Sequence, residues 1–212
     1  MKKKIIFLGP PGCGKGTQAQ MVSKEFNINH LSTGEIFRRI IKENYPSEIS
    51  KKIKEYVNKG LLVPDEIVFE AIKLVLNKEN FLLDGFPRNI NQAKLLENYL
   101  DGVPLDVVIY FEISDEEIIK RLTSRRICSK CGKVYNIYTL KPKNDNLCDN
   151  CNIELITRED DKLEVVKERI LVYRNETMPL IEFYNNKNIL ISLKAEDTIE
   201  NIYSQIKKII SS

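Results

Sequence analysis

Five short apolar runs divide the chain, and each has the length of a buried β-strand. They lie at Lys4–Leu8, Ile28–Leu31, Phe81–Asp84, Val107–Phe111 and Ile189–Leu193. Because the runs are almost continuously apolar, they are typical of parallel strands that are covered on both faces. The pattern therefore predicts a parallel sheet of five strands.

Segments with a helical spacing of apolar residues lie between these runs. The expected helices are Gly16–Phe26, Ser50–Val57, Glu66–Leu76, Asn91–Leu100, Asp115–Arg125, Asp160–Tyr184 and Thr198–Ile210. Strands that alternate with helices predict a doubly wound α/β domain with right-handed crossovers. Ligands of such domains bind beyond the carboxyl ends of the strands.

Two segments interrupt the alternation of strands and helices. Residues 33–63 have helical character without a strand, which predicts a small inserted subdomain. Residues from about 124 to 161 are rich in Cys, Lys, Asn and Asp and have little apolar periodicity. A loop of that length needs its own stabilisation or has a functional reason to exist.

The first apolar run leads into the pattern of a phosphate-binding loop, Gly9–Thr17, which reads GPPGCGKGT. Glycines allow successive backbone N–H groups to point at a phosphate, and the N-terminus of the following helix adds positive potential. Lys15 can then reach the β- and γ-phosphates of a nucleotide. The alternative is a Gly/Pro turn with a surface lysine, but the strand–loop–helix context favours the phosphate site. Gly16 stands where a Ser or Thr normally binds Mg²⁺.

An acidic residue ends the third predicted strand, in the segment Asp84-Gly85-Phe86-Pro87-Arg88. A carboxylate at this edge of the sheet can hold the water shell of Mg²⁺ beside the phosphates. The alternative is a simple strand-terminal turn, because Asp-Gly is a common turn pair. The phosphate loop in the same chain favours the Mg²⁺ interpretation.

Arginines gather at the starts and ends of the two interrupting segments. They are Arg38, Arg88, Arg121, Arg125, Arg126, Arg158 and Arg169. Guanidinium groups bind phosphate oxygens in a bidentate manner and stay charged, which suits a site where two polyphosphates meet. Arg121 and Arg126 could equally be ordinary surface cations.

Four of the five cysteines form two Cys-x-x-Cys pairs, Cys128 with Cys131 and Cys148 with Cys151. This spacing is that of a four-thiolate zinc ribbon, in which the protein supplies every ligand and the metal is structural. Disulfides or unligated thiols are the alternatives. The turn formers Gly132 and Asn152 follow the two pairs and favour metal binding.

Composition and charge exclude several classes of protein. The net charge of +3 implies no polyelectrolyte partner. No apolar run is long enough to span a bilayer, and the opening Met-Lys-Lys-Lys is too short for a signal peptide. We expect a cytoplasmic protein with no membrane partner. The one histidine, His30, is expected to have a structural or solvent-facing role.

Taken together, the phosphate loop, Ser32-Thr33-Gly34, Asp84–Arg88 with Gln92, and the cysteine pairs resemble the adenylate kinases of the long-lid type, in order and over essentially the whole chain. The resemblance implies a three-layer P-loop NTPase fold with sheet order 2-3-1-4-5. It implies a core of residues 1–31, 64–123 and 162–212, a helical NMP-binding insertion at 32–63, and a zinc-binding lid at 124–161.

The resemblance also assigns nucleotide contacts. The ATP site would comprise Gly12, Cys13, Gly14, Lys15, Gly16, Thr17, Arg125, Val134, Tyr135 and Asp197. The AMP site would comprise Thr33, Arg38, Leu61, Leu62, Val63, Gly85, Phe86, Pro87, Arg88, Gln92, Arg158 and Arg169. Thr33 and Gln92 would face the adenine, while Arg38 and Arg88 would hold the phosphate.

The implied reaction is reversible transfer of the terminal phosphoryl group from Mg-ATP to AMP, which gives two ADP and maintains adenine nucleotide balance. The catalytic residues would be Lys15, Arg88, Arg125, Arg158 and Arg169, with Asp84 holding Mg²⁺ through water. The nucleophile is an ionised phosphate oxygen, so no general base is needed, in agreement with the single histidine. Zn²⁺ would be structural, the partners would be ATP, AMP and ADP, and the enzyme would be a monomer.

Two alternatives remain open at this stage. A GTP:AMP or UMP/CMP kinase is possible because Arg125, Val134 and Tyr135 do not determine the donor base, although Thr33 and Gln92 favour AMP as acceptor. A zinc-ribbon ATPase that binds nucleic acid belongs to a different class. The low net charge and the scarcity of aromatic residues in the ribbon argue against it.

Lys15→Met should remove nearly all phosphoryl transfer and leave the fold intact, because Lys15 alone is placed by the motif to reach the β- and γ-phosphates. Steady-state kinetics together with circular dichroism check this expectation. A folded variant with near-normal turnover would contradict the role of Lys15.

Overall fold

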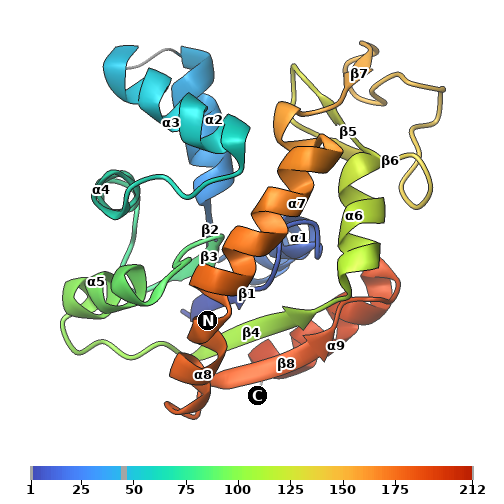
Figure 1. Ribbon diagram of the computed structural model, residues 1–212. Coiled ribbons are helices and arrows are strands. Elements are labelled where there is room, and N and C mark those ends of the chain that lie inside the picture. The colour runs from blue at the N-terminus through green and yellow to red at the C-terminus, as the bar shows by residue number, and fades with distance from the viewer. Residues whose placement is uncertain (1, 44–46, 212) are drawn as a thin grey trace.

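A five-stranded parallel sheet forms the centre of the molecule (Figure 1). The computed structural model describes residues 2–43 and 47–211. The strands are β1 (Lys4–Leu8), β2 (Asn29–Ser32), β3 (Phe81–Asp84), β4 (Val107–Glu112) and β8 (Leu190–Lys194), in the order β2-β3-β1-β4-β8. If only the strands of this sheet are numbered in chain order, β8 is the fifth and the order is 2-3-1-4-5. The predicted α/β fold class and strand order are therefore confirmed.

The two faces of the sheet pack against different sets of helices. The α-helices are α1 (Lys15–Phe26), α2 (Thr33–Glu43), α3 (Ser47–Lys59), α4 (Asp65–Lys73), α5 (Ile90–Leu100), α6 (Asp115–Thr123), α7 (Leu163–Val172), α8 (Pro179–Asn185) and α9 (Ile199–Ser211). On β1, Ile5 and Phe7 join the cluster of α1 and α9, whereas Ile6 and Leu8 join the cluster of α4, α5 and α8. Successive strand residues face opposite sides, so this alternation makes a three-layer structure.

The register of the sheet brings the predicted motifs to one edge. Asp84 pairs with Phe7 of β1 on one side and with Ser32 of β2 on the other. The loop that follows β1 and the helix that begins at Thr33 therefore start on either side of Asp84. In Figure 1, α2, α3 and a second, smaller sheet stand beyond the same edge of the central sheet.

The helix expected over Asp160–Tyr184 is wrong as a single element. A 3-10 turn (Glu159–Asp161), α7, a wide π turn (Tyr173–Thr177) and α8 replace it. Pro179 has no N–H to donate to the preceding turn, so the helix cannot run through it regularly. The π turn also brings the Thr177 hydroxyl within 2.7 Å of the Arg88 carbonyl oxygen, to which it donates.

The helix expected over Asp115–Arg125 ends at Thr123, so Arg125 is not helical. Arg125 instead begins β5 (Arg125–Cys128), which pairs with β6 (Val134–Asn136) and β7 (Leu155–Ile156) in an antiparallel sheet. Ser124 marks the change: its hydroxyl donates to the helix carbonyl of Lys120 and accepts from the Asn136 side chain at 2.8 Å. The segment after residue 124 therefore has a small sheet that its weak periodicity did not predict.

The segment 33–63 is helical, as expected, with α2 and α3 as its elements. Residues 44–46 of this segment lie outside the described residues. The second strand runs to Ser32, one residue beyond its predicted end, and α3 and α4 begin at Ser47 and Asp65, before the predicted starts. In the described part of the chain, no helix combines the length and the apolar character needed to cross a lipid bilayer.

The centre of the sheet should tolerate truncation far less than its edge. Ile6→Ala, in the fully buried strand β1, should lower the free energy of unfolding by roughly 2–5 kcal/mol because it leaves a cavity. Ile191→Ala is the matched control on edge strand β8, where the side chain is 41 % exposed, and should cost less than half as much. Urea denaturation measures both values. Equal losses would contradict the packing described.

Candidate functional site

The phosphate loop has the backbone conformation that its glycines predict. Gly14 precedes α1 in the left-handed region, with φ of 98°, and Lys15 is the first residue of the helix. Gly12 also has positive φ (81°), and a Cβ there would lie only 2.8 Å from Leu122 of α6. Only glycine fits at position 12, because the loop packs directly against that helix.

Lys15 folds over its own loop. Its Nζ donates to the carbonyl oxygens of Gly9 at 2.7 Å and Pro10 at 2.8 Å, and to the Sγ of Cys13 at 3.3 Å. The ammonium group is therefore held above the loop that the motif assigns to phosphates. Cys13 is buried, so its side chain belongs to the core.

Asp84 lies between the phosphate loop and the rest of the site. The Asp84 Oδ2 lies 3.6 Å from Nε2 of His30. The same oxygen faces Gly16, where an added Cβ atom would be 3.4 Å from it. Burial alone would raise the pKa of Asp84, but His30, Lys15 and Arg88 together hold it below its usual value. The carboxylate is thus ionised beside Gly16, where it can replace the hydroxyl that most phosphate loops supply for Mg²⁺.

A pocket that is partly open to solvent lies between α2, α3, α7 and the carboxyl end of β3. Nine of the residues predicted to bind AMP line it: Thr33, Arg38, Leu61, Leu62, Val63, Gly85, Arg88, Gln92 and Arg169. The lining also includes Gly34 of the Ser32-Thr33-Gly34 motif, together with Phe37, Val57, Gly60, Val68 and Asp160, which the motifs did not single out. The backbone of Gly85 lies close to the side chain of Thr33: a Cβ atom on Gly85 would be only 2.9 Å from the Thr33 hydroxyl.

The electrostatics of this pocket are dominated by arginine. Burial, and next the neighbouring charge of Arg169, lower the pKa of Arg88 to about 10. Burial, and next the charges of Arg125 and Arg38, lower the pKa of Arg158 to about 9. Guanidinium groups whose pKa falls this far lack sufficient negative charge around them. The site can therefore hold an added anion.

Two aspartates that sequence reasoning missed partly balance these charges. Asp161 accepts from Nε of Arg125 at 2.8 Å, and Asp160 lies 3.1 Å from Nη1 of Arg169. Burial would raise the pKa of Asp160, but Arg169, Arg125, Arg158 and Arg38 hold it low. A charge balance could have found this pair, since arginines that converge in a fold need carboxylates nearby.

Arg158 has a buried guanidinium nitrogen, Nε, without a hydrogen-bond partner among the described residues. An unpaired donor of this kind is costly unless a ligand accepts from it.

Several predicted residues have side chains outside the pocket. Phe86 is fully buried and stacks with Phe69, with ring centroids 6.4 Å apart, and Pro87 is also buried. The Asp197 carboxylate lies just before α9, where it accepts from the backbone N–H of Thr198 and from the side chain of Asn201. Tyr135 is buried in the small sheet, whereas its neighbour Val134 is half-buried.

Arg121 and Arg126, which the sequence left as either site residues or surface cations, form hydrogen bonds and an ion pair within the protein. Arg121 donates to the Ala195 carbonyl oxygen at 2.9 Å and pairs with Glu117. Arg126 donates to the carbonyl oxygens of Thr123 and Arg125. These contacts are structural, and they join the end of α6 to its surroundings.

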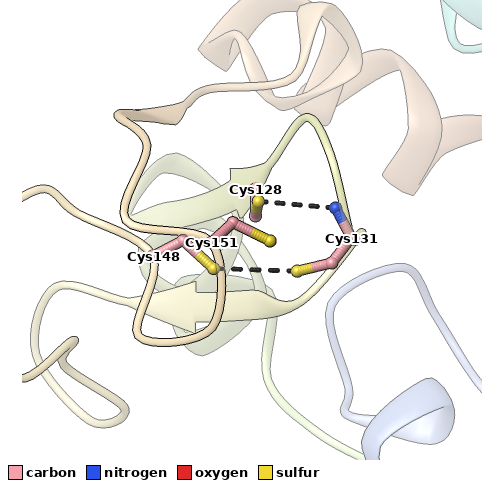
Figure 2. A group of neighbouring side chains, drawn as sticks. All are labelled: Cys128, Cys131, Cys148 and Cys151. Atoms are coloured by element: carbon pink, nitrogen blue, oxygen red, sulfur yellow. Dashed lines mark hydrogen bonds between the residues drawn. The ribbon is translucent and has the colours of Figure 1, made fainter.

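The four clustered cysteines converge on one point, as Figure 2 shows. Their sulfur atoms all lie within 4.8 Å of one another, and Sγ of Cys131 is 3.6 Å from Sγ of Cys148. Thiolates around a tetrahedral zinc ion, with Zn–S bonds of about 2.3 Å, stand about 3.8 Å apart. All five cysteines are free, so the structure favours a metal over disulfides.

The two Cys-x-x-Cys turns have the same local geometry. The residue after each pair, Gly132 or Asn152, is left-handed, and its N–H donates to the carbonyl oxygen of the first cysteine at 2.9 and 2.8 Å. The Tyr135 hydroxyl donates to Sγ of Cys148 at 3.5 Å. Burial would raise the Cys148 pKa, but Tyr135 and backbone N–H groups lower it to about 6. Such a thiol is readily available as the thiolate that metals bind.

Removal of one cysteine ligand should release the metal and lower thermal stability without unfolding the core, because the small sheet has little apolar interior. Cys148→Ser tests this by metal analysis and calorimetry. Cys13→Ser is the control, since Cys13 lies outside the cluster and should leave the metal content unchanged. Equal melting temperatures with and without metal would contradict a structural metal.

Comparisons with known proteins show the family of the chain. A family model described as adenylate kinase matches residues 7–189. An adenylate kinase of Caldanaerobacter subterraneus subsp. tengcongensis is 48 % identical, over 97 % of this chain and 95 % of its own. One of Thermoanaerobacter sp. (strain X514) is 46 % identical, over 97 % and 96 %. One of Thermotoga maritima is 44 % identical, over 99 % and 98 %. The chain belongs to the adenylate kinase family.

Proposed function

We propose that this chain transfers the terminal phosphoryl group of Mg-ATP to AMP, reversibly, to give two ADP. This is the reaction of the family to which the chain belongs. The observation that supports it most strongly is a pocket lined by Arg38, Arg88 and Arg169, which repel one another, at the same sheet edge as a phosphate loop.

The donor nucleotide binds at the phosphate loop in this proposal. The backbone N–H groups from Gly12 to Thr17 surround its phosphates, and Lys15 turns from its own loop carbonyls to the β- and γ-phosphates. Arg125 and Val134 lie at the start of the small sheet and contact the donor from the other side. Tyr135 takes part through its backbone, because its ring is buried. The contact near Asp197 is likewise a backbone contact, since its carboxylate already accepts from Thr198 and Asn201 at the start of α9.

The acceptor AMP occupies the arginine-lined pocket. Arg38 and Arg88 hold its phosphate, while Thr33 and Gln92 face its base beside the wall formed by Leu61, Leu62 and Val63. Phe86 and Pro87 support this wall from the core rather than by side-chain contact. Arg158 and Arg169 approach from the opposite side, where they can bind the phosphoryl group in transit.

Catalysis requires positioning and charge stabilisation in this proposal. The attacking AMP oxygen is ionised at neutral pH, so no side chain has to remove a proton from it. The arginines and Lys15 stabilise negative charge on the transferring group. Mg²⁺, when bound, would supply positive charge that neutralises the donor phosphates, and the ionised Asp84 would hold its water shell.

The segment 124–161 acts as a lid pinned by structural Zn²⁺, and the segment 32–63 acts as the NMP-binding insertion. The remainder, 1–31, 64–123 and 162–212, is the core. Closure of the lid excludes water, which would otherwise hydrolyse ATP; adenylate kinases are themselves a well-known example of such gating. We further propose a cytoplasmic monomer whose partners are ATP, AMP and ADP.

A coupled assay with ATP and AMP, followed by substitution of GTP for ATP, tests the proposal directly. ADP formation that depends on both nucleotides and on Mg²⁺ supports it. GTP that outperforms ATP would change the donor, and tight, salt-sensitive binding to RNA or DNA would point to a different class of function.

Arg88→Ala should lower kcat/KM for AMP roughly 10- to 100-fold, the cost of losing a charge-assisted hydrogen bond to phosphate. The KM for ATP should change much less. Arg174→Ala is the matched control, because Arg174 is exposed and pairs with Asp115 on the surface. Unchanged AMP kinetics in the Arg88 variant would exclude it from the acceptor site.

A further inference from the structure

The side-chain amide of Gln92 is held at both ends. Its Oε1 accepts from the backbone N–H of Arg88 at 2.8 Å, and its Nε2 donates to Oδ1 of Asp65 at 2.8 Å. Gln92 is 1 % exposed and lines the acceptor pocket. After these two bonds, one N–H and one oxygen lone pair remain for a ligand.

These two partners leave no ambiguity about which amide atom is which. A backbone N–H can only donate, so the Gln92 atom that faces Arg88 must be the oxygen. An ionised carboxylate can only accept, so the atom that faces Asp65 must be the nitrogen. The usual uncertainty between the oxygen and nitrogen of an amide does not arise here.

Asp65 is itself held in the ionised form by amides rather than by a cation. Its carboxylate accepts from Asn89 at 3.0 Å, from Asn91 at 2.7 Å and from Gln92. Burial would raise the Asp65 pKa, but these three bonds hold it below its usual value. Asp65 begins α4, and its three partners lie at the start of α5, where helix N-termini favour negative charge.

A fixed amide can distinguish two kinds of purine. A 6-aminopurine presents a donor at N6 and an acceptor at N1, whereas a 6-oxopurine presents an acceptor at O6 and a donor at N1. An amide that binds one edge must turn over by 180° to bind the other. The cost of turning decides how strongly the second base is rejected.

We propose that Asp65 is a positioning residue for selection of the acceptor base. Together with the Arg88 N–H, its carboxylate holds the Gln92 amide in one orientation, so that the pocket accepts a 6-aminopurine monophosphate and rejects a 6-oxopurine one. This inference rests on the proposed function, in which Gln92 faces the base of the acceptor.

Asp65→Asn tests the proposal, with AMP and IMP as acceptors and ATP as donor. IMP is the appropriate probe because it differs from AMP at N1 and C6 and has no added 2-amino group. An asparagine can offer either an oxygen or a nitrogen to Gln92, so turning the amide over then costs only its bond to the Arg88 N–H, whereas in the wild type it costs both bonds. The ratio of kcat/KM for AMP to that for IMP should fall at least about tenfold. The change should lie mainly in KM, with kcat for AMP within about a factor of three.

Two further variants separate base selection from stability. Asp115→Asn removes a carboxylate from the first turn of α6, far from the acceptor pocket, and should leave the AMP-to-IMP ratio unchanged. Asp65→Ser keeps a residue that favours helix starts, and its hydroxyl can donate or accept, so it should lower the ratio as Asp65→Asn does. If Asp65→Asn does not fold, Asp65→Ser carries the same test.

Each result decides between the proposals. A wild-type ratio in both Asp65 variants, with normal use of AMP, overturns the positioning role and leaves the proposed function standing. Equal losses for AMP and IMP indicate a merely structural role and also overturn it. A wild-type chain that does not phosphorylate AMP overturns the proposed function itself, and this inference with it.

Discussion

Five arginines, Arg38, Arg88, Arg125, Arg158 and Arg169, are held close enough to repel one another, and this repulsion is the constraint on which the site depends. Burial removes part of the water that would stabilise each guanidinium, and neighbouring charges add to the cost. The fold tolerates the arrangement because Asp160 and Asp161 stand among the arginines and pair with two of them. The remaining excess of positive charge is available to phosphate oxygens.

Separate elements of the fold hold the five arginines and the residues beside them in place. The parallel sheet brings the phosphate loop and Asp84 to one edge, where register alone makes them neighbours. The π turn before α8 lets Thr177 bond the backbone of Arg88. The cysteine turns stabilise a small sheet that begins with Arg125 and has little apolar interior. A carboxylate outside the cluster, Asp65, accepts from Gln92 and thereby links α4 to the arginine-lined pocket.

The sequence motifs were more reliable predictors than the boundaries of the helices on which the site residues lie. The five strands, the phosphate loop and the convergence of four cysteines are confirmed, since each rests on contacts close in sequence or on a strong apolar signal. The helix over Asp160–Tyr184 and the helical state of Arg125 were wrong. In both places the helical periodicity of the sequence continues beyond the end of the regular helix. Contacts of Ser124 with Asn136 mark the end of α6, and Pro179, which has no N–H, interrupts the longer helix. The roles of individual nucleotide-binding residues stay predictions.

The sequence by itself determined the sheet, its apolar strands, the loop glycines and the two cysteine turns, because local spacing and side-chain chemistry suffice for these. Only the tertiary structure decided which charges meet. Asp160 and Asp161 carry no motif, and their importance comes from arginines up to about 120 residues distant in sequence. The orientation of Gln92 likewise depends on Asp65, 27 residues earlier. Electrostatic balance and amide orientation depend on distances between separate elements, and those distances exist only after the chain has folded.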